Sequence, residues 1–368
     1  FNRRKDGSSY RDWISETFEA SLKMSSLDRK DIDTLIVSSE SDFFTLQLNP
    51  STVIADDLGL HNVEALRVEG GGASGQIAVH QGIKSILSNT SENVAVIGFD
   101  PSASNLPSET VKKLYSYSFD AWTDGMNEVT ATSLYALSIQ IFMDKTGLDE
   151  NDLANLTINN RNNACLNPGA HLKLEHTHEE IINSPVISSP YRRLHCSPLS
   201  DGAASIILSK KISSKRKTAP SIIGIGSAND KVNLGARDEI GEFKSKKLAM
   251  KKACQMAQVL PSEIGFAEVY DAYAGAQFQA INALGLSDNF LKDFRDGVFN
   301  LDGKLPINIS GGLMGQGAPV GATGVGQTAT CAMVLEGNYH DKLQFSLIPK
   351  FALADTHGGV GTNAAVSI

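Results

Sequence analysis

The chain has 368 residues, of which 41% are hydrophobic and 20% charged, and its formal net charge is −8. This length can hold two ordinary domains with a large core, and the acidic balance argues against a nucleic-acid or anionic-membrane partner, since both require clustered positive charge. No run approaches the roughly 18 apolar residues of a membrane-spanning helix. The four cysteines form no Cys-x-x-Cys pair, so we expect neither a zinc site nor a disulfide framework. Free cysteines fit a reducing compartment, and we expect a cytoplasmic location.

The first half of the chain alternates helical patterns with apolar runs. The sequence opens without a recognisable signal peptide, and its abrupt start on Phe1 is compatible with a first strand upstream. Apolar residues at every fourth position between 14 and 22 predict a helix, whereas the continuous apolar runs at 34–37 and 94–98 predict buried strands. A glycine-rich turn before a second helical stripe at 79–87 completes an alternation that predicts an α/β layered domain.

The stretch from about 101 to 198 is less regular and is rich in Asn, Pro and Ser. It predicts a long loop insertion on the first half, where residues that contact ligands tend to lie. Trp122 and Met126 lie in this stretch and are candidates for lining an acyl pocket, although ordinary burial explains them equally well. His176 and His178 stand among acidic residues and are better explained by a solvated face than by a metal site.

The second half repeats the order of the first. Residues 246–259 predict a helix and 264–269 a strand, and further strands are expected near 345–348 and 364–368. Between them the segment 310–324 contains too many glycines for the interior of an element. It either lets two helices touch or directs backbone N–H groups at a ligand oxygen, and it matches neither a P-loop nor a dinucleotide fingerprint.

Each half therefore contains a strand, a glycine-rich turn, a helix of small residues and another strand. This order predicts an internal duplication in which the two central helices pack together, because small residues allow close approach. The polar and basic segment 209–219 separates the halves. We expect a first half at 1–212, including the loop region at about 101–198, and a second half at 213–368.

Several motifs then agree with one family. Residues 308–312, Asn-Ile-Ser-Gly-Gly, followed by 317–324, Gly-Ala-Pro-Val-Gly-Ala-Thr-Gly, closely resemble the thiolase signature NxxGG and GHPxGAxG. Residues 69–75 resemble the nucleophile loop, residues 268–273 the His-Asp-Cys-Phe motif, and residues 356–359 the C-terminal Cys-x-Gly. The segments 163–168 and 195–204 resemble the loop region of the sterol-carrier-protein-type and archaeal-type thiolases. The resemblance covers nearly the whole chain and implies the duplicated α/β/α/β/α thiolase fold, usually as a homodimer or tetramer.

The chain departs from the motifs at the groups that carry out acyl transfer. By the resemblance, a thiolase needs a nucleophilic cysteine, histidines that activate it and polarise the thioester, and a second cysteine for the α-proton. Here Gly72 stands at the nucleophile position, Ala318 and Tyr270 at histidine positions, and Thr356 at the second cysteine. Ser74 lies two residues beyond the nucleophile position, and no histidine is placed by sequence to deprotonate it. We therefore do not expect covalent acyl transfer by the usual route.

The backbone frame of such a site remains in the sequence. Backbone N–H groups can form an oxyanion hole that stabilises a thioester enolate without any nucleophile, each donor contributing roughly 3 kcal/mol. The candidate catalytic residues are Tyr270, His357 and Asp271, the candidate backbone donors are Gly72, Gly358 and Gly359, and the candidate substrate contacts are Ser74, Asn308, Ala318, Trp122 and Met126. A core tyrosine at a strand end and a histidine bonded to backbone explain Tyr270 and His357 equally well.

Three functions stay open. The first is an acyl-CoA enzyme that makes or breaks a carbon–carbon bond through a thioester enolate, such as retro-aldol cleavage of a β-hydroxyacyl-CoA. It resembles the thiolase-like retro-aldolases, which lack the cysteine and work with a small OB-fold partner protein, although their second tyrosine, near Ala318, is missing here. The second is a non-catalytic acyl-CoA-binding subunit of a complex, and the third is an acetyl-CoA acetyltransferase with a non-standard nucleophile. In each case the CoA thioester is the substrate, and no metal or covalently bound cofactor is expected.

Overall fold

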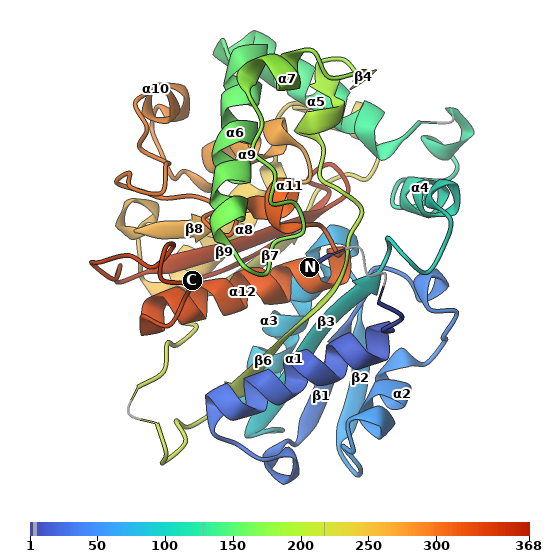
Figure 1. Cartoon of the computed structure of the whole chain (residues 1–368), viewed down its shortest axis with the longest axis vertical. Coiled ribbons are helices and arrows are strands. Elements are labelled where there is room, and N and C mark those ends of the chain that lie inside the picture. The colour runs from blue at the N-terminus through green and yellow to red at the C-terminus, as the bar shows by residue number, and fades with distance from the viewer. Residues whose placement is uncertain (3–5, 128, 217) are drawn as a thin grey trace.

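The computed structural model describes residues 1–2, 6–127, 129–216 and 218–368. Two four-stranded sheets lie on either side of a central pair of helices, and further helices cover their outer faces (Figure 1). This arrangement is the five-layer α/β/α/β/α order that the sequence resemblance implies. Among the described residues, no helix is both long and apolar enough to cross a bilayer.

The first sheet has the strand order β2-β1-β3-β6. Strand β1 is parallel to both of its neighbours, whereas β6 runs antiparallel to β3. The predicted strands are confirmed, and their apolar runs are fully buried because helices cover both faces of the sheet. The elements of this half are α1 (Tyr10–Ser25), β1 (Thr34–Ser38), α2 (Pro50–Asp57), β2 (Glu64–Val68), α3 (Ser74–Leu87), β3 (Asn93–Pro101) and β6 (Asp201–Ser209).

The second sheet also has four strands, in the order β7-β10-β9-β8. Here β8 and β9 are parallel, and β10 is antiparallel to both β9 and β7. The elements are β7 (Ile225–Asn229), α8 (Lys244–Ala257), β8 (Phe266–Glu268), α9 (Ala274–Leu284), α10 (Phe290–Arg295), α11 (Gly312–Gln316), α12 (Val320–Glu336), β9 (Ala352–Gly358) and β10 (Asn363–Ser367). The strand expected at 345–348 is absent, because Leu347 is 86% exposed and the following Pro349 cannot donate to a ladder.

The two central helices, α3 and α12, pack as closely as the small-residue pattern predicts (Figure 1). A Cβ added to Gly324 of α12 would lie 2.3 Å from the backbone nitrogen of Gln76, and one added to Gly75 of α3 would lie 2.9 Å from that of Gly324. Any larger side chain at these positions would force the two helices apart. The glycines therefore set the separation of the sheets, and with it the place where the two glycine-rich turns meet.

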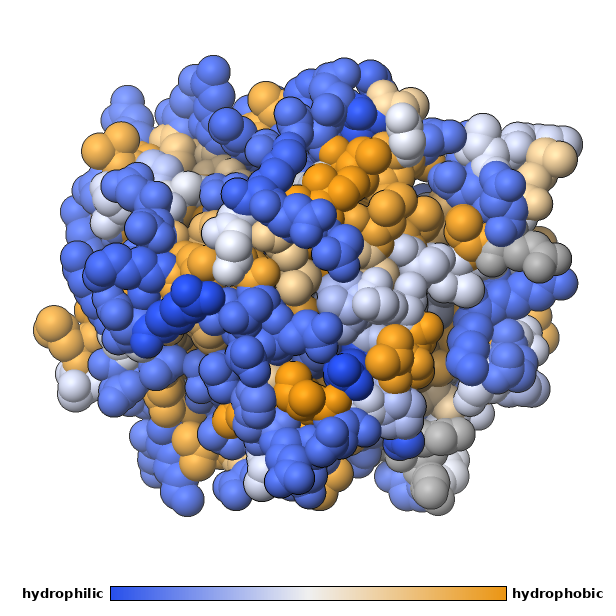
Figure 2. All heavy atoms as spheres, turned by 90° about the horizontal axis from the view of Figure 1, so that it is seen from above, coloured by the Kyte–Doolittle hydropathy of each residue, from blue (hydrophilic) through white to orange (hydrophobic). Residues whose placement is uncertain are grey.

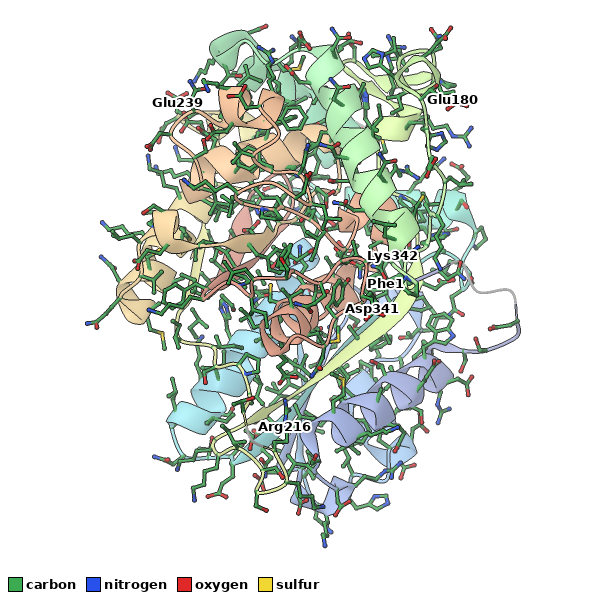
Figure 3. The ribbon with its side chains drawn as sticks, turned by 60° about the vertical axis from the view of Figure 1, so that its left-hand side comes forward. Phe1, Glu180, Arg216, Glu239, Asp341 and Lys342 are labelled. Carbon is green, nitrogen blue, oxygen red and sulfur yellow. The ribbon has the colours of Figure 1, made fainter. Side chains whose placement is uncertain are left out.

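The connection between the halves leaves β6 at Ser209 and enters β7 at Ile225, and it contains the proposed domain boundary at 212/213. Arg216 lies in this connection (Figure 3). Its side chain forms an ion pair with Glu336 at the end of α12. The ion pair ties the connection to the central layer of the molecule.

The expected loop insertion at 101–198 is instead largely helical. It contains α4 (Ser108–Ser116), α5 (Ala131–Thr146), α6 (Glu150–Leu166), α7 (His178–Ile182), and a hairpin of β4 (Val186–Ser188) and β5 (Tyr191–Arg192). The inner face of α6 is polar, which hid the helix in the sequence: Asn160 and Asn163 are buried and donate to Asp271 and to the Asn308 carbonyl. The segment forms a cap over the second sheet at the top of Figure 1.

Candidate active site

The turn between β2 and α3 is shaped by its own side chains. Gly71 has a positive φ of 56°, which favours glycine. The buried Ser74 hydroxyl accepts from the Gly70 N–H at 2.9 Å and donates to the Gly71 carbonyl at 2.7 Å. Ser74 therefore stabilises the turn from inside, and it does not line the cavity described below.

Position 72 in this turn has no room for a side chain. A Cβ at Gly72 would lie 2.2 Å from the backbone oxygen of His357 and 2.8 Å from the hydroxyl oxygen of Tyr270. Both distances are shorter than van der Waals contact allows. The phenol of Tyr270 thus occupies the space into which a nucleophilic cysteine would project, and the glycine at 72 is a requirement of this packing.

Tyr270 follows β8 and is 5% exposed, with Leu313 and Ala318 packed beside it. Its backbone N–H donates to Asp355 at 3.4 Å, and Asp355 also forms a fully buried ion pair with Lys246 of α8. Burial raises the pKa of the Tyr270 hydroxyl well above its usual value, and the nearby Glu40 acts in the same direction. The phenol therefore stays protonated and can donate.

His357 lies on β9, is fully buried, and meets the Tyr270 ring edge-on with 4.7 Å between centroids. Its Nε2 is 2.7 Å from the hydroxyl of Tyr135, and that hydroxyl also contacts the Gly359 carbonyl. Because a carbonyl only accepts, the single proton of Tyr135 goes to Gly359, so His357 Nε2–H donates to Tyr135. The neutral ring then carries its lone pair on Nδ1, which has no hydrogen-bond partner in the structure.

The charge state of His357 agrees with this arrangement. Burial lowers its pKa well below the usual value, and the cationic Lys246 and Arg237 lower it further. His357 is therefore a neutral imidazole with an acceptor nitrogen, and its ring lies against that of Tyr270. The combination places a proton donor and a proton acceptor beside position 72.

Thr356, at the position matched to the second cysteine, does not share this location. Consecutive residues of a strand point to opposite faces, and His357 rather than Thr356 lines the cavity. The Thr356 hydroxyl is buried without a partner. In this fold His357 is thus the residue that faces Gly72 from β9.

These groups meet in a cavity of about 430 Å³, a size suited to a small acyl group with part of its carrier. Gly72, Tyr270, Ala318, His357 and Gly359 all line it, so the structure brings together five of the residues singled out in the sequence. The helical cap contributes Tyr135 and Phe119 to the same lining. Figure 2 shows the cap end of the molecule as a mainly hydrophilic surface with separate hydrophobic patches.

Other candidate residues support the cavity from behind. Asp271 is buried and accepts from Asn160 at 2.8 Å and from the Leu313 N–H at 2.7 Å, so it holds the glycine-rich segment rather than Tyr270. Asn308 is buried, accepts from the Val269 N–H at 2.7 Å and donates to Gln277 at 2.9 Å. Neither side chain lines the cavity.

Three further candidates lie elsewhere than expected. Gly358 already donates its N–H to Asn363 Oδ1 at 2.9 Å, which leaves the Gly72 and Gly359 amides at the cavity wall. Trp122 and Met126 are 84% and 74% exposed and do not line the cavity. Their segment of the cap lies too far out to contribute to an acyl pocket in this structure.

Sequence reasoning missed Tyr135 and Glu40, both of which line the cavity. Glu40 follows the buried strand β1, and β1 is parallel to β2, which leads into the turn of Gly72. Because carboxyl ends of parallel strands meet at one edge of a sheet, an acidic residue there was a usable signal. Tyr135 lies in the stretch whose composition predicts irregular structure, so the sequence pattern gives no signal for this residue.

Comparison with known proteins gives a consistent result. Residues 226–368 match the family model described as thiolase C-terminal domain-like. The chain is 30% identical over 367 residues to an acetyl-CoA acetyltransferase of Methanothermobacter thermautotrophicus, covering 98% of this chain and 94% of that protein. It is 26% identical to the benzoylsuccinyl-CoA thiolase subunit BbsB of Thauera aromatica, covering 92% and 87%.

Among solved structures, the Ltp2–ChsH2(DUF35) aldolase superposes with a TM-score of 0.83 at 21% identity, covering 99% of this chain and 94% of that chain. A monomeric SCP2-thiolase-like protein of Mycobacterium smegmatis superposes with a TM-score of 0.74 at 18% identity, covering 99% and 74%. At these identities the likeness shows a shared fold.

Proposed function

Because the chain belongs to the thiolase superfamily, in its sterol-carrier-protein-type branch, we propose that it makes or breaks a carbon–carbon bond of an acyl-CoA through a thioester enolate. The reaction that the site supports best is retro-aldol cleavage of a β-hydroxyacyl-CoA, without an acyl-enzyme. The observation that carries this proposal is the closed position 72, where the Tyr270 hydroxyl and the His357 carbonyl occupy the space of a nucleophile.

The residues divide the enolate chemistry between them. The thioester carbonyl lies against the turn, where the backbone N–H groups of Gly72 and Gly359 stabilise the negative charge of the enolate oxygen. The Tyr270 phenol, protonated because burial raises its pKa, is the donor to the enolate. His357, neutral and with a free Nδ1, is the acceptor that allows the reverse step.

Alternative nucleophiles are poorly placed for acyl transfer. Ser74 is buried with its proton donated to the Gly71 carbonyl. Cys196 lines the cavity, but burial raises the pKa of its thiol to about 12, so the reactive thiolate is scarce at neutral pH. These two observations weigh against the acetyltransferase chemistry named for the Methanothermobacter relative, even though the family relationship is close.

A binding subunit is the second candidate function, and the name of the Thauera relative, a thiolase subunit, favours it. In either case we propose association with other chains. The aldolase of similar fold contains a DUF35 chain, which supports a small OB-fold partner here. Strand β2 is at the edge of its sheet and is paired only with β1 among the described strands, which suits assembly into a homodimer or tetramer.

The test is a coupled assay of acyl-CoA and carbonyl release from a series of β-hydroxyacyl-CoA esters, with and without candidate partners. Tyr270→Phe removes only the phenolic oxygen and should lower turnover by about 100-fold or more, the range for loss of a general acid. Mass spectrometry after incubation with acetyl-CoA should detect no acyl adduct. Tyr270→Phe with undiminished turnover, or a stoichiometric adduct, would rule the mechanism out.

A further inference from the structure

A second cavity of about 530 Å³ adjoins the one around Tyr270. The two cavities share Glu40, Tyr115, Ser118 and Gly359 in their linings. The shared wall therefore combines a residue after β1, two residues of the cap and the turn after β9. A substrate held at the Gly72 turn has this wall on one side.

The carboxyl group of Glu40 in this wall is incompletely bonded. Its Oε1 accepts from the Ser118 hydroxyl at 3.3 Å. Its Oε2 is buried and has no hydrogen-bond partner within the described part of the chain. Its backbone N–H is anchored to Asp100 at 3.2 Å. Among the residues that the structure describes, no cation forms an ion pair with Glu40.

Tyr115 adds a second unsatisfied group to the same wall. Its hydroxyl is buried near the Ser102 side chain but makes no hydrogen bond of normal geometry among the described residues. Its ring is held against Phe44 with 5.7 Å between centroids. Leaving a buried polar atom unpaired costs about 1–3 kcal/mol, and two such atoms in one cavity wall indicate a partner that the protein itself does not supply. A carboxyl and a phenol can both donate and accept, which suits a hydroxyl or carbonyl oxygen of a ligand.

We propose that Glu40 is a further catalytic residue of this site, which, with Tyr115, binds the β-oxygen of the substrate and exchanges a proton with it. This inference rests on the proposed function. In the cleavage direction, the Glu40 carboxylate takes the β-hydroxyl proton, the Cα–Cβ bond breaks, and the β-carbon becomes a carbonyl. The electron pair of the broken bond forms the thioester enolate, which Tyr270 protonates at Cα, and the proton on Glu40 returns to the tyrosinate through water.

The electrostatic setting of Glu40 supports this role. Burial raises the pKa of its carboxyl well above the usual value, and the neighbouring Asp100 and Glu69 raise it further. A carboxylate whose pKa is raised is a stronger base toward the β-hydroxyl proton than an ordinary surface glutamate. The phenols of Tyr115, Tyr270 and Tyr135 also lie near Glu40, and they stay neutral because burial raises the pKa of each.

The experiment separates the two halves of the reaction. Exchange of the α-protons of acetyl-CoA with D₂O, followed by NMR, requires enolate formation but no β-oxygen, whereas cleavage of a β-hydroxyacyl-CoA requires both. We expect Glu40→Gln to lower kcat for cleavage by about 100-fold or more, with KM changed less than threefold and α-proton exchange retained. Tyr115→Phe should lower cleavage by about tenfold, as expected for loss of one hydrogen bond.

A matched control is Glu179→Gln, the same carboxyl-to-amide change at an exposed position of α7 outside both cavity linings, which should leave both reactions unchanged. Cleavage by Glu40→Gln within threefold of the unmodified protein would overturn the inference while leaving the proposed function standing. Loss of exchange together with cleavage in Glu40→Gln would also overturn it, because Glu40 would then act on the thioester frame. Absence of exchange and cleavage in the unmodified protein would reject the proposed function, and the inference with it.

Discussion

Replacing Gly72 with alanine or cysteine is the most direct test of the closed nucleophile position. A single Cβ there meets backbone oxygen at 2.2 Å and the Tyr270 hydroxyl at 2.8 Å. The nearer atom belongs to the backbone of β9 and cannot rotate away, so the strand itself must shift. Overpacking of this kind typically costs 1–3 kcal/mol, and because two contacts are violated at once we expect about 2–3 kcal/mol for Gly72→Ala and at least as much for Gly72→Cys.

The measurement is equilibrium unfolding in urea, read from tryptophan fluorescence and circular dichroism. Gly125→Ala is the matched control, since a Cβ at Gly125 finds its nearest neighbour at 3.7 Å and φ is not positive there. Its unfolding free energy should change by less than about 0.5 kcal/mol. Gly72→Cys should also fail to form an acyl adduct with acetyl-CoA. A Gly72→Ala protein as stable as the Gly125→Ala protein, or an acylated Gly72→Cys protein, would refute the packing argument.

Three further predictions concern the histidines and the substrate. Tyr135→Phe removes the hydroxyl that holds His357 Nε2 and should lower kcat by about tenfold with little change in KM. The control is Tyr10→Phe, which makes the same change on α1 outside the cavity. Equal rates in the two variants would contradict the role of Tyr135. Lowering the pH from 7 to 4 should destabilise the unmodified protein relative to His80→Gln, because burial lowers the pKa of His80 to about 4 while the unfolded chain binds the proton near its usual value of roughly 6.5. Because the pKa of His80 is lower in the folded state, the unfolded chain binds the proton first on acidification. The contribution of neutral His80 to the free energy of unfolding is therefore complete above a pH of about 6.5 and is lost as the pH falls. Urea midpoints that change in parallel in the two proteins across this range would contradict the prediction. Finally, the second cavity is lined by Glu40, Glu69 and Asp230 and by no Lys, Arg or His among the described residues. We therefore expect β-hydroxyacyl-CoA esters with an uncharged β-side chain to show at least tenfold higher kcat/KM than analogues that end in a carboxylate. Comparable kcat/KM values for the two classes of ester would contradict this preference.

Sequence pattern was enough to predict two α/β halves and most of the strands and central helices within them. Apolar periodicity located α1, β1, β3, α8 and α12, because burial of an amphipathic face repeats at the period of the element. The glycine-rich turns predicted the contact of the two central helices, since only glycine permits the separation seen between Gly75 and Gly324. Motif resemblance also identified Gly72, Tyr270, Ala318, His357 and Gly359, which the structure brings to one cavity.

Apolar periodicity failed to predict the helix α6, because its buried face is polar. The inner face of α6 carries asparagines, which lower its apolar periodicity, yet these side chains are satisfied by Asp271 and Asn308 from the second half of the chain. Such pairings join residues more than 100 positions apart, and no window of sequence contains both partners. A helix whose buried side chains are polar and hydrogen-bonded therefore resembles a loop in its amino-acid composition.

The groups that face each other inside the site could be identified only in the folded molecule. Whether His357 or Thr356 lines the cavity depends on the register of β9, because a shift of one residue along a strand reverses every side chain. His357 donates its hydrogen bond to Tyr135, 222 residues away in the chain. The space of the missing side chain at Gly72 is taken by Tyr270 from the other half. Proton positions and free volume are properties of packing between distant segments, so they follow from the folded arrangement and not from the motifs that build it.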